Sequence, residues 1–362
     1  MAILLSGDKI YRALQEHLDN LPDGFSPAKD GKDIQLLKKL FSLEEAELAI
    51  NLSLTKEDAE TIASKINLPK KMVEQRLESM AKKGLIFSTE IEGRMFYQAA
   101  PWVIGIYEFQ VNRLDDEFLE NMYDYYKQRI DVPRSETIPQ LRTIPINQSI
   151  DTKLDVLPYE KVDEIINAHT KFGVAPCICR TKEKMLGRGC DAPIETCLLF
   201  GDFADFYART GRGRLIEKAE VKKLLEEANK ANLVLNPTNS RFVSAICCCC
   251  GDCCGILRGL QSEPKPAEAV ASSFIVQYDP ETCLGCGICV NRCQMQAITI
   301  DEPRVNVNSD RCIGCGLCVS TCPVNALSLV RKPESLLKEI PQTFYDTWVK
   351  ISQDQSKQKS EL

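Results

Sequence analysis

Apolar residues recur at helical spacing through the N-terminal third of this chain. Between Asp33 and Leu54, leucines and isoleucines fall three or four positions apart with acidic residues between them, which predicts two short helices. A third helix is expected to follow Thr55, which serves as its N-cap, with Asp58 completing a variant of the capping box. A fourth is predicted from about Lys70 to Lys83, where Gly84 stops it.

Two apolar runs after this helix flank a turn dipeptide. Leu85–Phe87 and Arg94–Tyr97 lie on either side of Glu92-Gly93, which predicts a β-hairpin. The order helix, helix, turn, helix and hairpin resembles a winged-helix domain, and Leu77-x6-Gly84-Leu85-Ile86 resembles the end of its recognition helix. The resemblance implies a surface for nucleic acid or protein on this helix.

The rest of the chain alternates helical segments with proline-rich and polar connections. Helices are expected at 109–130, 160–170 and 217–232, and strands at Ile298–Ile300 and Arg304–Val307. A polar, disordered segment is expected after Ser352. The chain is therefore predicted to be a multidomain α+β protein. Its predicted parts are an N-terminal extension (1–30), a winged-helix-like domain (31–100), a helical connector (101–157), a cysteine-rich domain of helices and irregular structure (158–262), a ferredoxin-like two-cluster domain (272–332) and a C-terminal tail (333–362).

Cysteine is the residue whose abundance changes this picture. The chain has 362 residues, of which 18 are Cys and only 2 are His, and every Cys follows residue 176. The start carries only a short apolar run before Asp8, which predicts no export signal, and no run approaches the roughly 18 apolar residues of a membrane span. A cytoplasmic protein is expected, in which clustered thiols bind metal or do redox chemistry rather than form disulfides.

Two runs of four cysteines repeat one spacing near the C-terminus. They are Cys283-x2-Cys286-x2-Cys289-x3-Cys293 and Cys312-x2-Cys315-x2-Cys318-x3-Cys322-Pro323. Three thiolates at i, i+3 and i+6 in a tight loop can each reach a different iron of one cubic cluster, and the glycines between them let the backbone wrap closely. The spacing predicts two [4Fe-4S] clusters and disfavours zinc. Gln294 stands where the second run has Pro323, and it is no ligand.

The two runs resemble those of bacterial two-cluster ferredoxins. In that family the fourth Cys of each run binds the other cluster. The resemblance assigns Cys283, Cys286, Cys289 and Cys322 to one cluster, and Cys312, Cys315, Cys318 and Cys293 to the second.

Ten further cysteines form two groups in the middle of the chain. The first group is Cys177, Cys179, Cys190 and Cys197, and the second is Cys247, Cys248, Cys249, Cys250, Cys253 and Cys254. Adjacent cysteines form disulfides only with severe strain, so this density favours metal or cluster binding. Because alternate residues of an extended chain face the same way, Cys247 and Cys249 are expected to serve one site and Cys250 another.

These groups predict one or two further [4Fe-4S] clusters. One possible ligand set is Cys177, Cys179, Cys190 and Cys197; a second is Cys247, Cys249, Cys250, Cys253 and Cys254, with Cys248 as the spare. A structural zinc with some free thiols is the alternative. Arg180 and Arg188 are candidates for charge-assisted contacts with a negative cluster, whereas the lone His169 is expected to be a core or solvated residue.

The middle motifs, the repeats, the winged-helix-like start and the segment Gly105–Phe109 together resemble a family of 4Fe-4S dicluster-domain proteins of anaerobic bacteria and archaea. The resemblance covers residues 30–335. It implies an architecture and no reaction, so the function has to be argued from the sites.

An iron–sulfur electron-transfer protein or oxidoreductase subunit is the function that these motifs favour, rather than a stand-alone enzyme. The sequence has no strand-linked G-x-G-x-x-G or G-x4-G-K-[ST] motif, so any hydride step would belong to a partner, and the expected partners are a donor and an acceptor protein. One alternative is a redox-sensing transcription regulator that uses the winged helix. Residues 1–130 hold 17 Lys and Arg against 22 Asp and Glu, which disfavours nucleic acid. A reductase with an open-site cluster in the middle domain is the other alternative.

Overall fold

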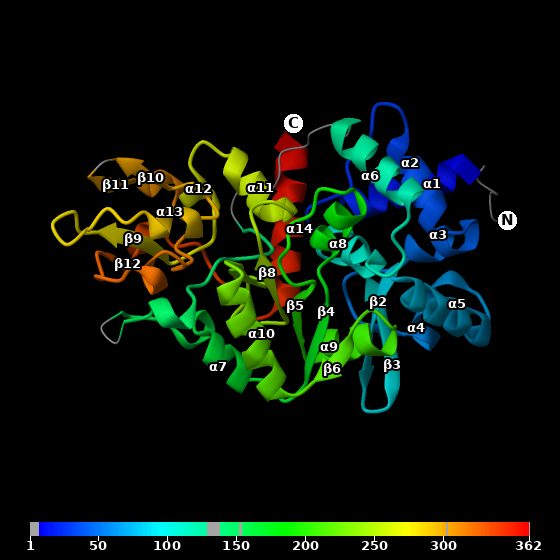
Figure 1. The fold of residues 1–362 in the computed structure, drawn as a ribbon. Coiled ribbons are helices and arrows are strands. Elements are labelled where there is room, and N and C mark those ends of the chain that lie inside the picture. Colours follow the sequence, from blue (N-terminus) through cyan, green and yellow to red (C-terminus); the bar gives the residue numbers. More distant parts are fainter. Residues whose placement is uncertain (1–6, 129–137, 152–153, 302, 362) are drawn as a thin grey trace. The chain divides into compact units, whose positions relative to one another are not determined.

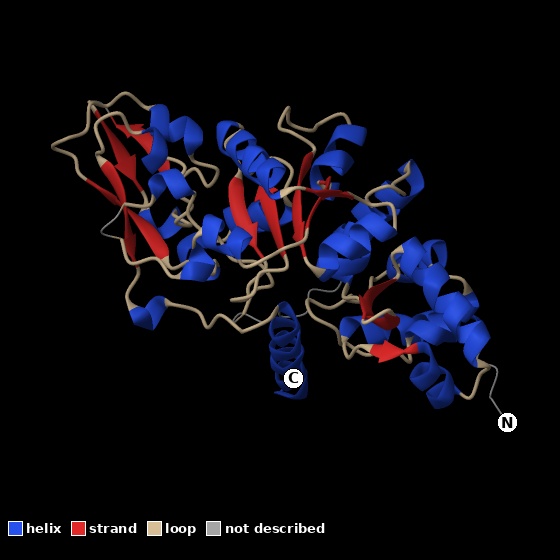
Figure 2. Ribbon diagram, turned by 90° about the horizontal axis from the view of Figure 1, so that it is seen from below, coloured by secondary structure: helices blue, strands red, loops and turns tan. Residues whose placement is uncertain are grey.

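The computed structural model describes residues 7–128, 138–151, 154–301 and 303–361 and divides the chain into two compact units (Figure 1). Unit 1 is drawn from residues 1–136, 205–212 and 348–362, and unit 2 from residues 137–204 and 213–347. Each unit contains both helices and strands (Figure 2), which is consistent with the predicted α+β class. The cysteine-rich segment and the two-cluster segment, which the sequence treats as separate domains, share unit 2.

The helices predicted at the start of unit 1 form where the apolar pattern places them. The two short ones are α2 (Lys32–Leu40) and α3 (Leu43–Ala49). A capping box begins α3, because the Ser42 hydroxyl accepts from the backbone N of Glu45 while the Glu45 carboxylate accepts from that of Ser42. Unit 1 also contains α1 (Gly7–Asp19), α4 (Ala59–Ile66), α5 (Lys70–Lys83) and α6 (Asp116–Gln128).

The predicted N-cap at Thr55 is wrong. Helix α4 begins at Ala59, and its cap is Asp58, whose Oδ1 accepts from the backbone N of Thr61 at 2.8 Å. The reason is a long-range pairing: Glu57–Asp58 form the short strand β1, which pairs with Tyr97 and Phe96. An extended conformation at these two residues delays the helix past the position that the local pattern favours.

The predicted hairpin is present. Strands β2 (Ile86–Ile91) and β3 (Arg94–Ala99) pair antiparallel, and both turn residues have positive φ, 50° at Glu92 and 76° at Gly93. A two-residue turn with positive φ at both positions matches the right-handed twist of the two strands that it connects. With β1 the strands form a three-stranded sheet in the order β1-β3-β2. The order of these elements is the one predicted, and the winged-helix interpretation remains a prediction.

Gly84 lies so close to neighbouring atoms that there is no room for a side chain. Its replacement by alanine should therefore destabilise the protein. It ends α5 with φ 75°, and an added Cβ would lie 2.6 Å from Phe109 Cβ and 2.6 Å from Arg212 Nη2. We expect Gly84→Ala to lower the free energy of unfolding by about 2–4 kcal/mol, through backbone strain and overpacking together. Urea denaturation followed by circular dichroism measures this loss.

Gly93→Ala is the matched control for this substitution. Gly93 has φ 76°, as Gly84 has φ 75°, but a Cβ added at Gly93 would meet no atom of the described residues within 4 Å. Its replacement should cost only the backbone strain, about 1 kcal/mol. Equal losses in the two variants would contradict the role of the Phe109 and Arg212 contacts.

The core of unit 2 is a five-stranded sheet with the order β6-β4-β5-β8-β7, in which every neighbouring pair is antiparallel. The prediction that the cysteine-rich domain consists of helices and irregular structure is therefore wrong, because pairing between distant segments makes strands of its short apolar runs. Its strands are β4 (Phe172–Pro176), β5 (Glu195–Phe200), β6 (Arg214–Ile216), β7 (Val234–Pro237) and β8 (Ala245–Cys249). The helices predicted near 160–170 and 217–232 are α7 (Val162–Asn167) and α10 (Lys218–Lys230), and α10 packs beside β5 (Figure 1).

The end of unit 2 contains two small antiparallel sheets. Strands β10 (Ile298–Asp301) and β11 (Arg304–Val307) pair as predicted, and β9 (Phe274–Tyr278) pairs with β12 (Leu327–Arg331). The other α-helices that lie wholly within the described part of unit 2 are α8 (Ile178–Met185), α11 (Gly255–Ser262), α12 (Pro266–Ala269) and α13 (Ile288–Arg292).

Two helices contribute residues to both units, α9 (Asp202–Arg209) and α14 (Phe344–Glu361). The polar segment after Ser352 was expected to be disordered, and within the described residues it continues α14 to Glu361. The helix is anchored at its start, since Phe344, Trp348 and Ile351 are buried at helical spacing.

Candidate metal centres

Six of the middle cysteines come together at the ends of the central strands. Cys197 on β5 lies directly opposite Cys247 on β8, and Cys249 follows on the same strand. Cys177 and Cys254 are the N-caps of α8 and α11, and Cys179 lies in the first turn of α8. We call this set the six-thiol group: Cys177, Cys179, Cys197, Cys247, Cys249 and Cys254.

The thiols of the six-thiol group are near enough to one another to shift each other's pKa values. Cys177 and Cys254 influence the pKa of Cys179, Cys247 and Cys254 that of Cys249, and Cys197 that of Cys247. The neighbouring Cys179 thiol, together with burial, raises the pKa of Cys177 well above its usual value, and the neighbouring Cys197 thiol and burial do the same for the pKa of Cys247. Burial thus opposes free thiolates here, so a bound cation would have to supply the compensating charge.

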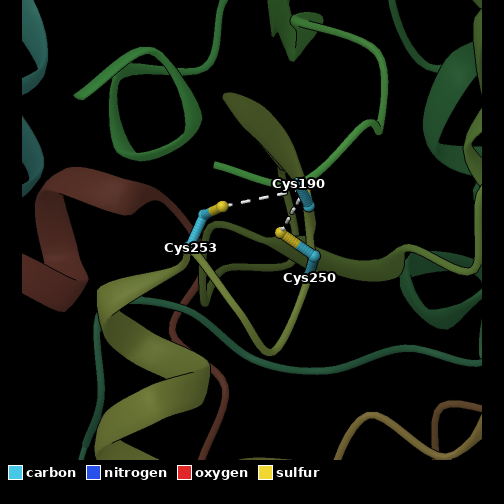
Figure 3. Close-up of side chains that lie close together, drawn as sticks. All are labelled: Cys190, Cys250 and Cys253. Carbon is cyan, nitrogen blue, oxygen red and sulfur yellow. Dashed lines mark hydrogen bonds between the residues drawn. The ribbon is translucent and has the colours of Figure 1, made fainter. Parts of the chain in front are cut away.

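Three other cysteines form a separate cluster, which we call the three-thiol group. Cys190 Sγ lies 3.6 Å from Cys250 Sγ and 3.7 Å from Cys253 Sγ, and the three side chains point toward one another (Figure 3). Cys190 comes from the loop between α8 and β5, and the other two from the turn between β8 and α11. The structure therefore separates Cys190 from Cys177, Cys179 and Cys197, the set with which the sequence grouped it.

Arg180 places a buried positive charge beside the three-thiol group. Its side chain is 0% exposed, and Nη2 lies 3.5 Å from Cys250 Sγ. Three oxygens hold the guanidinium: the carbonyls of Pro193 (2.5 Å) and Cys248 (3.2 Å) and the hydroxyl of Thr196 (2.8 Å). Although burial opposes ionisation of Cys250, the hydrogen bond and charge of Arg180 hold the pKa of this thiol below its usual value.

The other middle residues singled out in the sequence belong to neither thiol group. Arg188 donates to the Glu183 carboxylate at 2.5 Å. His169 is buried, with its ring stacked on Phe200 at a centroid distance of 4.9 Å, as expected for a core residue. Cys248 alternates with Cys247 and Cys249 along β8 and so faces the other side of the strand, and burial raises its pKa to about 12.

The eight cysteines of the repeats line two hollows. The outer hollow is lined by Cys283, Cys286, Cys289 and Cys322, and the inner hollow by Cys293, Cys312, Cys315 and Cys318. The fourth Cys of each run thus lies with the first three of the other run. This is the crossed arrangement that the ferredoxin resemblance implies, and four thiols around one hollow fit a cubic cluster.

Backbone amides point at the sulfurs of both hollows. The amide of Ala297 donates to Cys293 Sγ and that of Ala326 to Cys322 Sγ, each at 3.2 Å, so the two repeats make the same contact. The amides of Gly285 and Val276 donate to Cys283 Sγ and Cys312 Sγ at 3.4 Å. Such hydrogen bonds stabilise charge on the ligating sulfur and tune the reduction potential of a bound cluster.

The two hollows differ in their surroundings. At the outer hollow Cys286 is exposed and Leu284 is 69% exposed. At the inner hollow Cys293 and Cys315 pack against the apolar core of unit 2, whose buried members include five cysteines of the middle region, Cys248, Cys249, Cys250, Cys253 and Cys254. The outer hollow is therefore open to solvent, whereas the inner one adjoins the middle cysteines.

Gln294 joins the inner hollow to the middle cysteines. Its Oε1 accepts from the backbone N of Gly251 at 2.6 Å, and its Nε2 donates to the carbonyl of Asn232 at 2.9 Å. Its own carbonyl accepts from Gln261 Nε2 at 2.7 Å. The sequence marks this residue only as a departure from the repeat. The signal that was available is the polar side chain at a position where the second run has Pro323.

Comparison with known protein families supports the iron–sulfur interpretation of the two cysteine repeats. Residues 276–329 match the 4Fe-4S dicluster domain family. No curated protein and no solved structure matches this chain. Residues 276–329 thus form an iron–sulfur domain of ferredoxin type, and the ten middle cysteines lie before the matched segment. None of the helices in the described residues has both the length and the apolar character needed to cross a bilayer.

Proposed function

We propose that this chain relays single electrons between redox partners, through two clusters held in the outer and inner hollows and at least one further centre held by the middle cysteines. The observation that carries the proposal is the Gln294 bridge, because it connects the two cysteine regions directly. The ligands proposed for the ferredoxin clusters are the four cysteines of each hollow. Iron–sulfur clusters bound there would supply one-electron chemistry.

The contacts of the bridge support an order along the relay. Gln294 follows Cys293 of the inner hollow, and Gly251, to which it is hydrogen-bonded, lies between Cys250 and Cys253. The exposed Cys286 and Leu284 leave the outer hollow accessible to another protein. We therefore place the external partner at the outer hollow, the inner hollow next, and the middle centre last.

The six-thiol group is the proposed site of the additional cluster. Its members come from both sequence groups: the register of β5 with β8 places Cys197 opposite Cys247, and the starts of α8 and α11 carry Cys177, Cys179 and Cys254. Six thiols exceed the four ligands that one cubic cluster needs, so the group holds enough ligands for a cluster without Cys190. Asn236 on β7, which the sequence did not single out, pairs with Cys247 in the sheet and adds a polar neighbour to this site: its Oδ1 accepts from the Thr143 hydroxyl at 2.8 Å, and its buried Nδ2 has no hydrogen-bond partner in the described residues.

Metal analysis of the anaerobically purified chain tests the proposal. We expect about twelve to sixteen iron atoms per chain with matching sulfide, since each cubic cluster contributes four. Electron paramagnetic resonance of the reduced protein should then show more than two interacting clusters. A content of about eight iron atoms is the number for two clusters. It would refute the additional cluster and, with it, electron transfer beyond the ferredoxin domain.

The redox-sensing regulator is the second candidate, and the order of α4, α5 and the β2–β3 hairpin is the observation that favours it. Two of the basic residues on α5 are already ion-paired: Lys70 with Glu60 at 2.8 Å and Lys83 with Glu45 at 2.7 Å. These pairs reduce the charge offered to phosphate, so we rank electron transfer first. Binding to promoter DNA that changes on oxidation would reverse this ranking.

A further inference from the structure

The three-thiol group has the dimensions of a site for a single metal ion. The two measured sulfur–sulfur distances are 3.6 and 3.7 Å, and all three sulfurs lie within 4.8 Å of one another (Figure 3). Four thiolates at about 2.3 Å from one tetrahedral Zn²⁺ are separated by about 3.8 Å. In a cubic cluster each thiolate binds a different iron, which holds the sulfurs farther apart.

The other cysteines lack this close grouping. Within the described residues, Cys190, Cys250 and Cys253 are the only set of three or more Cys, His, Asp or Glu ligand atoms that lie this close together. The cysteines of the outer and inner hollows surround open space instead. The two kinds of arrangement thus differ within one unit of the same chain.

The sequence around two of the ligands fits the same chemistry. Cys250-Gly251-Asp252-Cys253 has the C-x2-C spacing that supplies two ligands of many zinc sites. The third ligand, Cys190, comes from a loop far earlier in the sequence, as in sites that join two segments of a fold. We propose that Cys190, Cys250 and Cys253 bind one Zn²⁺ ion, separately from the iron–sulfur clusters.

Charge and hydrogen bonding support an ion at this position. Three thiolates around one divalent ion carry one excess negative charge, and Arg180 supplies a buried positive charge 3.5 Å from Cys250 Sγ. The Pro193, Thr196 and Cys248 oxygens fix the guanidinium in place, in the way that outer contacts orient metal ligands. Gln294 holds the ligand-bearing turn through the amide of Gly251.

Three protein ligands leave one tetrahedral position for water or for another soft donor such as a thiol. The inference deepens the proposed function, because it removes Cys190, Cys250 and Cys253 from the cluster ligands and leaves the six-thiol group to hold one cluster. The chain would then contain about twelve iron atoms and one zinc.

The test is zinc and iron analysis of the tag-free full chain, purified anaerobically from iron-replete cells and dialysed against a weak chelator. We expect one zinc per chain, and zinc-edge X-ray absorption should show sulfur neighbours at about 2.3 Å. Cys253→Ala should lose the zinc and keep the iron of the unchanged protein. Cys248→Ala is the matched control, since Cys248 is a neighbouring buried thiol outside the group, and it should keep both metals.

Cys190→Ala provides a second variant, because Cys190 is only half-buried and its replacement is expected to disturb packing less than that of the buried Cys253. It should also lose zinc alone. Loss of about four iron atoms from either variant would show that these thiols bind a cluster and would overturn the inference. A mononuclear iron with sulfur ligands, seen by Mössbauer spectroscopy, would equally overturn the zinc assignment. An iron content of about eight with zinc retained would refute the proposed relay and leave this site intact.

Discussion

Replacement of Arg180 by methionine is expected to lower the free energy of unfolding by about 3–5 kcal/mol, the range observed when one partner is removed from a buried charged contact. The side chain is fully buried, and its guanidinium satisfies three oxygens as well as Cys250 Sγ. Methionine has a similar length and no donor, so all four acceptors would remain buried without this partner. The loss would be measured by anaerobic urea denaturation of the metal-loaded protein.

Arg188→Met is the matched control for this prediction. Arg188 lies just after α8, its side chain is 53% exposed, and its partner Glu183 is also ion-paired with Lys182 and Arg258. Its replacement should cost about 1 kcal/mol, because the buried Glu183 carboxylate keeps its two other cationic partners and only the half-exposed guanidinium is lost. A loss in Arg180→Met as small as that in Arg188→Met would show that the buried guanidinium does not stabilise this region.

Replacement of Gln294 by proline is expected to uncouple the ferredoxin domain from the middle centre while both ferredoxin clusters stay in place. The variant removes the hydrogen bonds to Gly251 and Asn232, and proline is the residue at the equivalent place of the second repeat, Pro323. We expect a stability loss of about 1–3 kcal/mol from the two unmade bonds. Iron content should be unchanged, and reduction of the middle centre after rapid mixing with a reductant should slow.

Gln277→Ala controls for the loss of an amide side chain in the same unit, because Gln277 is exposed on β9. It should change neither the stability nor the rate. Rapid-freeze paramagnetic resonance follows each cluster separately, which distinguishes slower transfer from loss of a cluster. If the middle centre of Gln294→Pro were reduced as fast as that of the unchanged protein, electron transfer to the middle centre would not depend on the Gln294 hydrogen bonds.

Local signals in the sequence were sufficient where one short segment determines its own conformation. The helix at Lys70–Lys83 and the hairpin at Glu92-Gly93 follow from apolar spacing and from residues that tolerate positive φ. The N-cap at Thr55 was mispredicted for the opposite reason, because residues 57–58 pair with a strand almost forty positions away. The sequence around Thr55 holds no information about this pairing between β1 and β3.

The candidate sites likewise differ in whether local sequence or tertiary structure determines them. The sequence by itself determined the eight ferredoxin cysteines, since a ligand spacing of three residues needs only one tight loop, and the repeat shows it twice. Tertiary structure alone decided the grouping of the middle cysteines. The pairing of β5 with β8 places Cys197 opposite Cys247, while the α8–β5 loop carries Cys190 to Cys250 and Cys253. Ligands from distant segments meet only where strand order and register place them, and these depend on the packing of the whole unit.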